Sequence, residues 1–284
     1  MERSCDTHRK SPAVMTSPPL PRTEFNGAIA SADVLRVPAL LNYGHFTTMQ
    51  VHQGCVRGLD LHMDRLAQGT QELFGHPLDL EQTRTWMRQI VGDDERALSL
   101  RVTIFSRAFD RERPLEAAAP DVLITTSAAR TRSAAPLRVG SVRYQRELAH
   151  LKHVGTFGLF HHKRLAQARG FDDALFVDPS GAISEGSVWN IGFLDDAGVV
   201  WSDAPALPGI SMQLLQRGLR ESGFATRTQR VELGRIAHFR SAFFTNSSCA
   251  VMPIACIDDV AFDVDARGFA ALETCYMTNP PQPL

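Results

Sequence analysis

Lysine is scarce in this chain. Of its 30 basic residues, 27 are arginine and only Lys10, Lys152 and Lys163 are lysine. Arginine keeps its proton in a protein, whereas a lysine amine can lose its proton and then attack a carbonyl carbon. Lys152 lies in the apolar and small-residue stretch ELAHLKHVGTFGL, residues 147–159. A lysine retained there, against the bias toward arginine, is a candidate for chemistry that arginine cannot perform.

Other absences exclude whole classes of function. The formal net charge is −1, so no basic excess points to nucleic acid or to a membrane surface. No apolar run approaches the length of a membrane span, and the first 15 residues have no apolar signal core. The five cysteines are scattered without a C-x-x-C pair, which argues against a zinc or redox site. We therefore expect a cytoplasmic protein with free thiols, no metal, no nucleic-acid partner and no membrane partner.

The chain organisation predicts two lobes. Residues 1–22 are polar and rich in proline and serine, and we interpret them as a disordered tail. The small, unpatterned residues at 128–136 form a candidate linker. This leaves a smaller N-terminal domain at 23–127 and a larger C-terminal domain at 137–284. Because strand and helix patterns mix without regular βαβ alternation, the predicted fold class is α+β.

Local patterns place the main elements. Asp79 is the expected cap of one helix, Ser211 is the expected cap of another, and Gly170 and Gly223 are expected to end helices. The turn DPSG, residues 178–181, predicts a hairpin. The expected strands cover 46–52, 98–106, 121–128 and 242–245, and the expected helices cover 61–74, 158–170 and 266–277.

Several polar features gain meaning when they are considered together. Glu185 lies in a strand pattern 33 residues after Lys152, and LPGIS, residues 207–211, offers backbone amides and a serine at a helix start. TNSS, residues 245–248, is a second hydroxyl-rich turn, and Arg65 lies on a helix. Taken singly, each is ordinary: a rim carboxylate, a helix cap, a turn, a solvated charge. Together they supply what pyridoxal phosphate needs, namely a lysine for its aldehyde, a carboxylate for its pyridine nitrogen and donors for its phosphate.

The ordered motifs resemble the class IV aminotransferases, which are fold-type IV pyridoxal-phosphate enzymes. This family includes branched-chain and D-amino-acid aminotransferases, R-selective amine transaminases and aminodeoxychorismate lyase. The resemblance covers roughly residues 25–262, through FNG, YGHF, LHMDRL, LKH, GFDDALFVDPSGAISEGSVWNIGF, LPGIS and TNSSCAVMPI. It implies two lobes with the cofactor between them, a homodimer, and an amino donor and a keto-acid acceptor as small-molecule partners.

The resemblance also assigns roles to single residues. Lys152 matches the catalytic Schiff-base lysine and Glu185 matches the partner of the pyridine nitrogen. Arg65 matches the phosphate-binding arginine, and Leu207 matches the residue under the ring. Three positions match phosphate donors: Ile210, Ser211 and Ser247, the last standing where the family often has threonine. Lys163, the rival lysine, lies among polar neighbours of a helix and is interpreted as solvated.

The substrate side departs from the family pattern. Phe46 matches an aromatic substrate-binding residue, but Thr47 follows it where the family often has glutamate. Arg111 and Arg113 in RAFDRERP are candidates to bind a carboxylate, although no histidine accompanies them and a solvated loop is the simpler interpretation. Ser187 is a further candidate for contact with a substrate carboxylate. Trp189 is expected in the core.

Three interpretations follow from the sequence. The first is an aminotransferase acting on an amino acid or amine. The second is a lyase of the aminodeoxychorismate type, in which the same lysine eliminates pyruvate without any acceptor. The third is a family member that retains the fold without turnover. The presence of both Lys152 and Glu185 favours an enzyme.

Overall fold

The computed structural model describes residues 21–94, 96–129, 135–264 and 266–284. Most of the predicted tail and the centre of the predicted linker, residues 130–134, lie outside the described residues. The prediction that the tail extends to residue 22 is wrong at its end. The carbonyl of Arg22 accepts a hydrogen bond of 3.0 Å from the backbone N–H of Thr126, so residue 22 is already bonded to the neighbouring strand.

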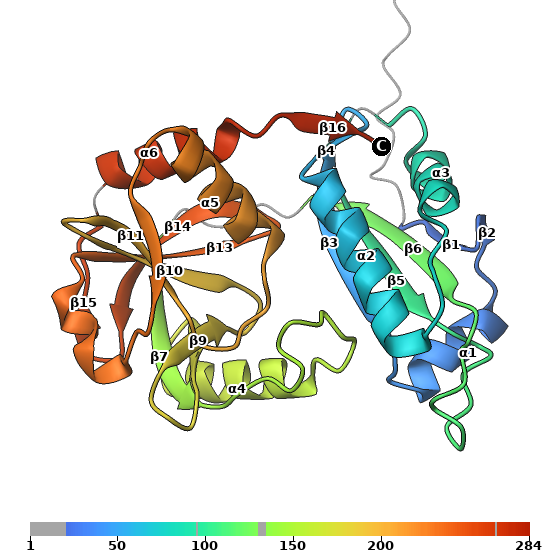
Figure 1. The fold of residues 1–284 in the computed structure, drawn as a ribbon, viewed down its shortest axis with the longest axis horizontal. Coiled ribbons are helices and arrows are strands. Elements are labelled where there is room, and N and C mark those ends of the chain that lie inside the picture. The colour runs from blue at the N-terminus through green and yellow to red at the C-terminus, as the bar shows by residue number, and fades with distance from the viewer. Residues whose placement is uncertain (1–20, 95, 130–134, 265) are drawn as a thin grey trace, which may run out of the picture.

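Two sheets form two lobes that lie side by side in Figure 1. The small-lobe sheet has seven strands in the order β16-β4-β3-β5-β6-β1-β2. Its strands are β1 (Thr23–Phe25), β2 (Ala28–Ile29), β3 (His45–His52), β4 (Cys55–Arg57), β5 (Leu98–Phe105), β6 (Asp121–Ala128) and β16 (Pro281–Pro283). The helices of this lobe are α1 (Ala32–Leu40), α2 (Leu59–Phe74) and α3 (Leu80–Val91).

Side-chain alternation gives the small-lobe sheet two different faces. Met49 and Val51 of β3 and Leu100 and Val102 of β5 are buried in one cluster with the apolar sides of α2 and α3. Neighbouring residues in a strand point to opposite faces, so the intervening positions of β3 and β5 face away from this core. Asp79 caps α3 as predicted, accepting a bond of 2.8 Å from the Gln82 N–H.

The large-lobe sheet follows the order β12-β11-β10-β13-β14-β7-β8-β9, with β15 paired to β14. Its strands are β7 (Leu137–Arg143), β8 (Asp173–Val177), β9 (Ile183–Gly186), β10 (Asn190–Asp195), β11 (Gly198–Ser202), β12 (Thr226–Gln229), β13 (Ser241–Asn246), β14 (Cys249–Ile257) and β15 (Val260–Ala261). The helical segments are α4 (Phe157–Ala168), α5 (Ile210–Glu221), α6 (Ala266–Met277) and the short 3₁₀ helix η1 (Leu233–His238). Helix and strand are mixed in both lobes, as the predicted fold class requires.

The end of the chain departs from the predicted division. Residues 137–284 were assigned to one C-terminal domain, but β16 pairs antiparallel with β4 and extends the small-lobe sheet. Figure 1 shows this last segment crossing from α6 to the other lobe. The edge strand β4 has unpaired backbone groups, which residues 281–283 satisfy, and Leu284 is buried in the small-lobe core.

Two local predictions are also corrected. Helix α5 begins at Ile210 with Gly209 as its N-cap, and the Ser211 hydroxyl instead donates to the Asn246 carbonyl at 2.8 Å. Lys163 is not simply solvated, because its Nζ lies 2.6 Å from Oδ2 of Asp173, whose side chain is only 2% exposed. Residues close in sequence had suggested a polar surface, but Asp173 approaches from the neighbouring strand β8.

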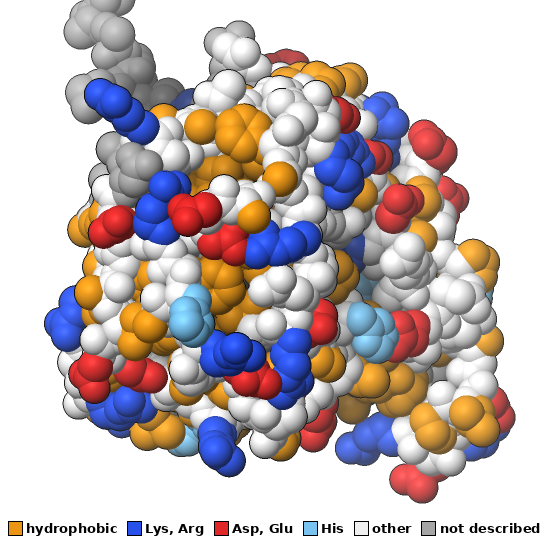
Figure 2. Space-filling view, turned by 60° about the vertical axis from the view of Figure 1, so that its left-hand side comes forward, with side chains coloured by type: hydrophobic (Ala, Val, Ile, Leu, Met, Phe, Trp, Pro, Cys, Tyr) orange, Lys and Arg blue, Asp and Glu red, His pale blue; other side chains and the backbone are white. Residues whose placement is uncertain are grey.

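The visible surface carries mixed charges. On the face shown in Figure 2, basic and acidic side chains are interspersed with apolar ones, in keeping with a net charge of −1. Within the described residues, no helix is long and apolar enough to cross a membrane.

Candidate active site

The loop that carries Lys152 is docked against the small lobe. It lies between β7 and α4, and its backbone follows the start of β3: the Phe46 N–H donates to the Lys152 carbonyl at 2.9 Å, and the Val154 N–H donates to the Gly44 carbonyl at 2.9 Å. The Lys152 side chain then extends over the Phe46 ring, with Nζ 4.9 Å from the ring centroid. The lysine therefore lies between the lobes rather than on the surface of either.

The non-core face of β3 and β5 forms one wall of the site. Phe46 pairs with Thr103, and the guanidinium of Arg101 lies 3.6 Å from the Phe46 ring centroid. Arg101 also donates from Nε to the Thr103 hydroxyl at 3.1 Å. Stacking and this hydrogen bond hold a half-buried cation beside the lysine. Burial lowers the pKa of Arg101, yet an arginine stays charged in such a setting.

The amine of Lys152 is tuned toward its neutral form. Burial is the main cause, and it lowers the pKa of Lys152 to about 7. Three guanidinium groups act in the same direction, those of Arg65, Arg146 and Arg101, while Glu185 opposes them. An amine with this pKa is substantially unprotonated near neutral pH, which is the state that attacks a carbonyl.

Glu185 presents an unused carboxylate oxygen. It lies on β9 and is 5% exposed, and its Oε2 accepts a bond of 3.2 Å from the Leu207 N–H. Its Oε1 is buried without a hydrogen-bond partner in the described chain. Burial raises the pKa of Glu185, whereas Arg146, the Leu207 N–H and Lys152 lower it. A buried carboxylate oxygen without a donor indicates that a ligand supplies one.

The backbone of Leu207 is held by hydrogen bonds at both its N–H and its carbonyl. Its N–H reaches Glu185, and its carbonyl accepts a bond of 2.7 Å from Nδ2 of Asn190. Two residues later, a Cβ on Gly209 would lie only 1.9 Å from the Asn190 side-chain oxygen, so this approach requires glycine. These contacts hold the backbone of Leu207, a residue that is 7% exposed, next to the carboxylate.

A cluster of polar groups meets at the start of α5. The backbone N–H groups of Ile210 and Ser211 lie in its first turn, where the helix offers them no carbonyl acceptor and an anion is favoured. The Ser211 hydroxyl binds the carbonyl of Asn246 at the turn between β13 and β14, and Ser247 is exposed in that turn. From the small lobe, Nη2 of Arg65 donates to the Pro208 carbonyl at 2.6 Å. Burial is the main cause that lowers the pKa of Arg65 to about 10.

The remaining candidates take different positions. Ser187 is 1% exposed and its hydroxyl lacks a partner in the described chain, which leaves it available to a ligand. Trp189 is in the large-lobe core as expected. Arg111 and Arg113 are exposed, and Arg113 forms ion pairs with Asp110 and Glu116 of its own loop. Their carboxylate-binding role stays a prediction.

Sequence reasoning missed two cations of this site. Arg101 had a usable signal, since it is a charged residue inside the apolar strand LSLRVTIF. Arg146 had none, because it lies in an irregular polar loop and only the tertiary structure buries it to 6% exposure.

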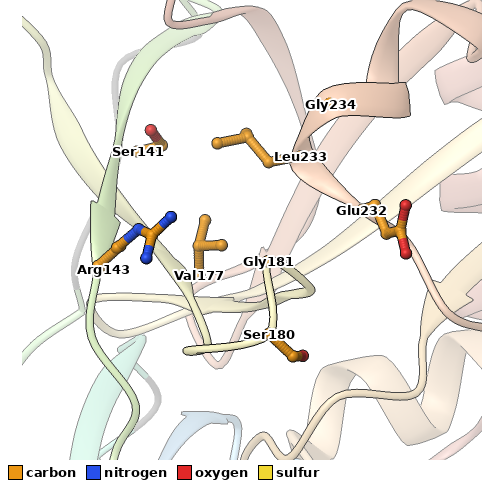
Figure 3. Close-up of a pocket in the computed structure, with 8 residues that line it drawn as sticks. All are labelled: Ser141, Arg143, Val177, Ser180, Gly181, Glu232, Leu233 and Gly234. Atoms are coloured by element: carbon orange, nitrogen blue, oxygen red, sulfur yellow. The ribbon is translucent and has the colours of Figure 1, made fainter.

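A separate cavity lies elsewhere in the large lobe. It measures about 480 Å³ and is shown in Figure 3, with Arg143 and Ser141 of β7 facing the β8–β9 turn and residues 232–234 at the start of η1. Neither Lys152 nor Glu185 lines it. The cavity is therefore not part of the interlobe site.

The family model described as amino-transferase class IV matches residues 44–257, which is most of the chain. The chain belongs to this family. The matched region includes every interlobe residue described above, from Phe46 to Ser247.

Solved structures of similar fold cover nearly the whole of this class IV family member. A branched-chain aminotransferase from the archaeon Thermoproteus uzoniensis, with norvaline, gives a TM-score of 0.81 at 17% identity, over 92% of this chain and 98% of the other. A T.th. branched-chain amino acid aminotransferase, complexed with N-(5'-phosphopyridoxyl)-L-glutamate, gives 0.78 at 18% identity, over 90% and 92%. A fold IV transaminase from Curtobacterium pusillum gives 0.73 at 22% identity, over 86% and 89%. These likenesses establish a fold-type IV architecture.

Curated relatives match over a shorter span. A probable branched-chain-amino-acid aminotransferase from Rickettsia felis is 33% identical over 97 residues, which is 34% of this chain and 33% of the relative. The branched-chain-amino-acid aminotransferase of Pseudomonas aeruginosa is 30% identical over 100 residues, which is 35% and 33%. The chain thus aligns with about a third of the length of these relatives.

Proposed function

We propose that this protein is a pyridoxal-phosphate-dependent aminotransferase that transfers an amino group from an amino acid or amine to a keto acid. The observation that carries the proposal is the pairing, in one interlobe site, of a lysine amine with a pKa of about 7 and a buried carboxylate oxygen without a donor. Family membership supports it, and so does the phosphopyridoxyl group named for the T.th. enzyme.

The residues present fit the cofactor. Lys152 is the amine for the aldehyde, and Oε1 of Glu185, without a partner among the described residues, can accept a hydrogen bond from a protonated pyridine nitrogen. Leu207 is positioned to support the ring. The anion site comprises Arg65, the N–H groups of Ile210 and Ser211, and the Ser247 turn, all of which meet at the start of α5. A doubly charged phosphate suits a helix start faced by a guanidinium.

The chain's own groups then have distinct tasks. When bound, pyridoxal phosphate supplies an electron sink that acidifies the Cα–H of an attached substrate. As a free amine, Lys152 would be the base that takes the substrate Cα proton and holds it for return. Glu185 would accept a hydrogen bond from the pyridine nitrogen and so keep that nitrogen protonated. Phe46 covers the amine and limits the access of water to it.

We further propose Arg101 as the partner of a substrate carboxylate. It is a fixed cation on the wall next to Lys152, and its contacts are a ring and a hydroxyl, which leave donors available. Replacing Arg101 with methionine should raise KM for an amino acid about 10- to 100-fold, with little effect on an amine that lacks a carboxylate. Arg111→Met and Arg113→Met are the matched controls. If either raises KM for the amino acid more than Arg101→Met does, the loop that carries Arg111 and Arg113 binds the substrate carboxylate instead.

The branched-chain aminotransferase relatives indicate which donors to test first. Leucine, isoleucine and valine, each offered with a keto-acid acceptor, form the first set, followed by their D-enantiomers and simple amines. Pyruvate released without any acceptor would instead support the lyase interpretation.

The decisive experiment follows cofactor uptake. The purified protein should absorb visible light with added pyridoxal phosphate, and borohydride reduction should fix the label on Lys152. With only three lysines in the chain, peptide mapping gives an unambiguous answer. Lys152→Ala should lose both the label and turnover. Measurable transamination by that variant, or a label on Lys163, would overturn the proposal.

We also propose a cytoplasmic homodimer. The described cysteines are free thiols, which suits a reducing compartment. Apolar side chains flank the Lys152 loop at the surface, with Leu148 at 56% exposure, Phe157 at 80% and Phe160 at 54%. Such a group is expected to be buried by a second copy. Light scattering after size-exclusion chromatography should give twice the chain mass, and Phe157→Asp should weaken the dimer. A monomeric wild type would refute this assembly.

A further inference from the structure

The Lys152 loop is neither helix nor strand, so its position depends on specific contacts. Arg146 supplies two of them from within the same loop. Its Nη2 donates to the Leu151 carbonyl at 2.9 Å, and its Nε lies 3.4 Å from Nε2 of His153. Together with the bond from Phe46 to the Lys152 carbonyl, these contacts hold three consecutive residues at the reactive position.

The positive charge of Arg146 is not neutralised by these hydrogen bonds. Within the part of the chain that the structure describes, both of its hydrogen bonds go to neutral groups, a backbone carbonyl and an imidazole nitrogen. The side chain is 6% exposed, so its charge is weakly screened. Burying an arginine without a directly bonded carboxylate is costly, which argues that the charge acts on neighbouring groups.

We propose that Arg146 is a positioning residue of the reaction, which clamps the Lys152 loop and supplies the fixed positive charge that Lys152 and Glu185 both face. This inference rests on the proposed roles of those two residues.

The electrostatic consequence has a definite sign. The groups facing Lys152 are Arg65 and His62 on α2, Arg101 on β5, Glu185 on β9 and Arg146. His62 adds no charge at neutral pH, because burial lowers its pKa to about 3. Arg146 lowers the pKa of Lys152 and also opposes the effect of burial on Glu185. One guanidinium therefore favours both the neutral amine and the ionised carboxylate.

The clamp also depends on the state of His153. Its Nε2 lies near two groups, Nε of Arg146 at 3.4 Å and the Glu147 carbonyl at 3.2 Å. It accepts from Arg146 only when Nε2 carries no proton. Burial, reinforced by Arg146, lowers the pKa of His153, which keeps the neutral ring available near pH 7.

The test uses the cofactor-free protein, so its readout does not depend on turnover. The rate at which acetic anhydride modifies Lys152 is followed against pH by peptide mass spectrometry. The wild-type midpoint is expected near 7. Arg146→Gln should move it upward by about half a unit or more, which slows labelling at pH 7 at least about twofold. Arg143→Gln, the same change at an exposed arginine three residues earlier, should leave the midpoint unchanged.

A charge-preserving variant separates the two roles. Arg146→Lys should retain the wild-type midpoint, because a positive charge remains, but one ammonium cannot reproduce the fork that binds residues 151 and 153. Its dissociation constant for pyridoxal phosphate should rise about tenfold. If Arg146→Gln fails to fold, this variant alone carries the test, and cofactor binding as tight as in the wild type would overturn the clamp.

The outcomes distinguish this inference from the proposed function. If wild-type protein takes up pyridoxal phosphate on Lys152 but Arg146→Gln and Arg143→Gln share the wild-type midpoint, only the role of Arg146 is refuted. If wild-type protein is not labelled on Lys152 by cofactor and borohydride, the proposed function itself fails.

Discussion

At the scale of single residues, the two described lysines have opposite environments. Lys163 is bonded to the buried carboxylate of Asp173, whereas Lys152 is surrounded mainly by arginines. The first arrangement is an ion pair with a buried partner. The second favours an amine that gives up its proton. The scarcity of lysine drew attention to both residues, and only their neighbours distinguish the ion-paired lysine from the candidate reactive one.

The Lys152 environment should lower stability in a pH-dependent way. With a folded pKa of about 7 against a usual 10.5, the unfolded chain holds this proton more tightly, so the folded state is penalised. The penalty is absent above about pH 10.5, grows as pH falls and is constant below about 7. Lys152→Met should therefore stabilise the cofactor-free protein by ~2 kcal/mol at pH 7 and by much less near pH 10. Urea unfolding at both pH values measures this, and a destabilised variant at pH 7 would contradict it.

The Lys163 environment, in contrast, should stabilise the folded protein. Lys163→Met leaves Asp173 buried without its cation, which should cost about 3 kcal/mol in the free energy of unfolding. Cofactor labelling of Lys152 should be unaffected. Lys163→Met, Asp173→Asn is the control, since removing both charges should recover most of the loss. If Lys163→Met is as stable as the wild type, the ion pair is only a surface contact.

At the scale of elements, α5 links packing to the site. Its first turn presents Ile210 and Ser211, and its other side packs against α6 through Gly218. A Cβ on Gly218 would lie 1.7 Å from the Cys275 carbonyl oxygen, which is backbone and cannot move aside cheaply. The glycine thus sets the separation of the two helices, and that separation positions the anion site.

Substituting this glycine tests the coupling. Gly218→Ala should destabilise the protein by about 2–4 kcal/mol, although alanine is intrinsically favoured within a helix. It should also weaken binding of pyridoxal phosphate, because the start of α5 shifts. Gly234→Ala is the matched control, since open space surrounds that position. Equal melting temperatures for the two variants would contradict the proposed close contact.

At the scale of the whole molecule, the lobes are joined at several points distant in sequence. The Lys152 loop follows β3, Arg65 reaches the Pro208 carbonyl, and β16 pairs with β4. The chain's last residue, Leu284, fills part of the small-lobe core from the far end of the sequence. The site depends on the relative position of the lobes, and these contacts fix it.

The contribution of the last segment can be measured directly. Leu284→Ala should lower the free energy of unfolding by about 2–3 kcal/mol, because the side chain is 6% exposed. Met277→Ala, at 60% exposure on α6, should change it by less than ~0.5 kcal/mol. Thermal unfolding of both variants checks this, and similar melting temperatures would show that the small-lobe core does not depend on the C-terminal segment.

The elements and the candidate reactive groups could be predicted from the sequence alone. Alternating and helical patterns located most of the strands and helices, and the motifs identified Lys152, Glu185 and the start of α5, because such signals are local in the chain. The tertiary structure decided the rest. The burial of Arg146, the stacking of Arg101 on Phe46, the Lys163 ion pair and the return of β16 all join residues that no local pattern relates. The reason is physical: desolvation and through-space charge, which set the pKa of Lys152, exist only once distant segments pack together.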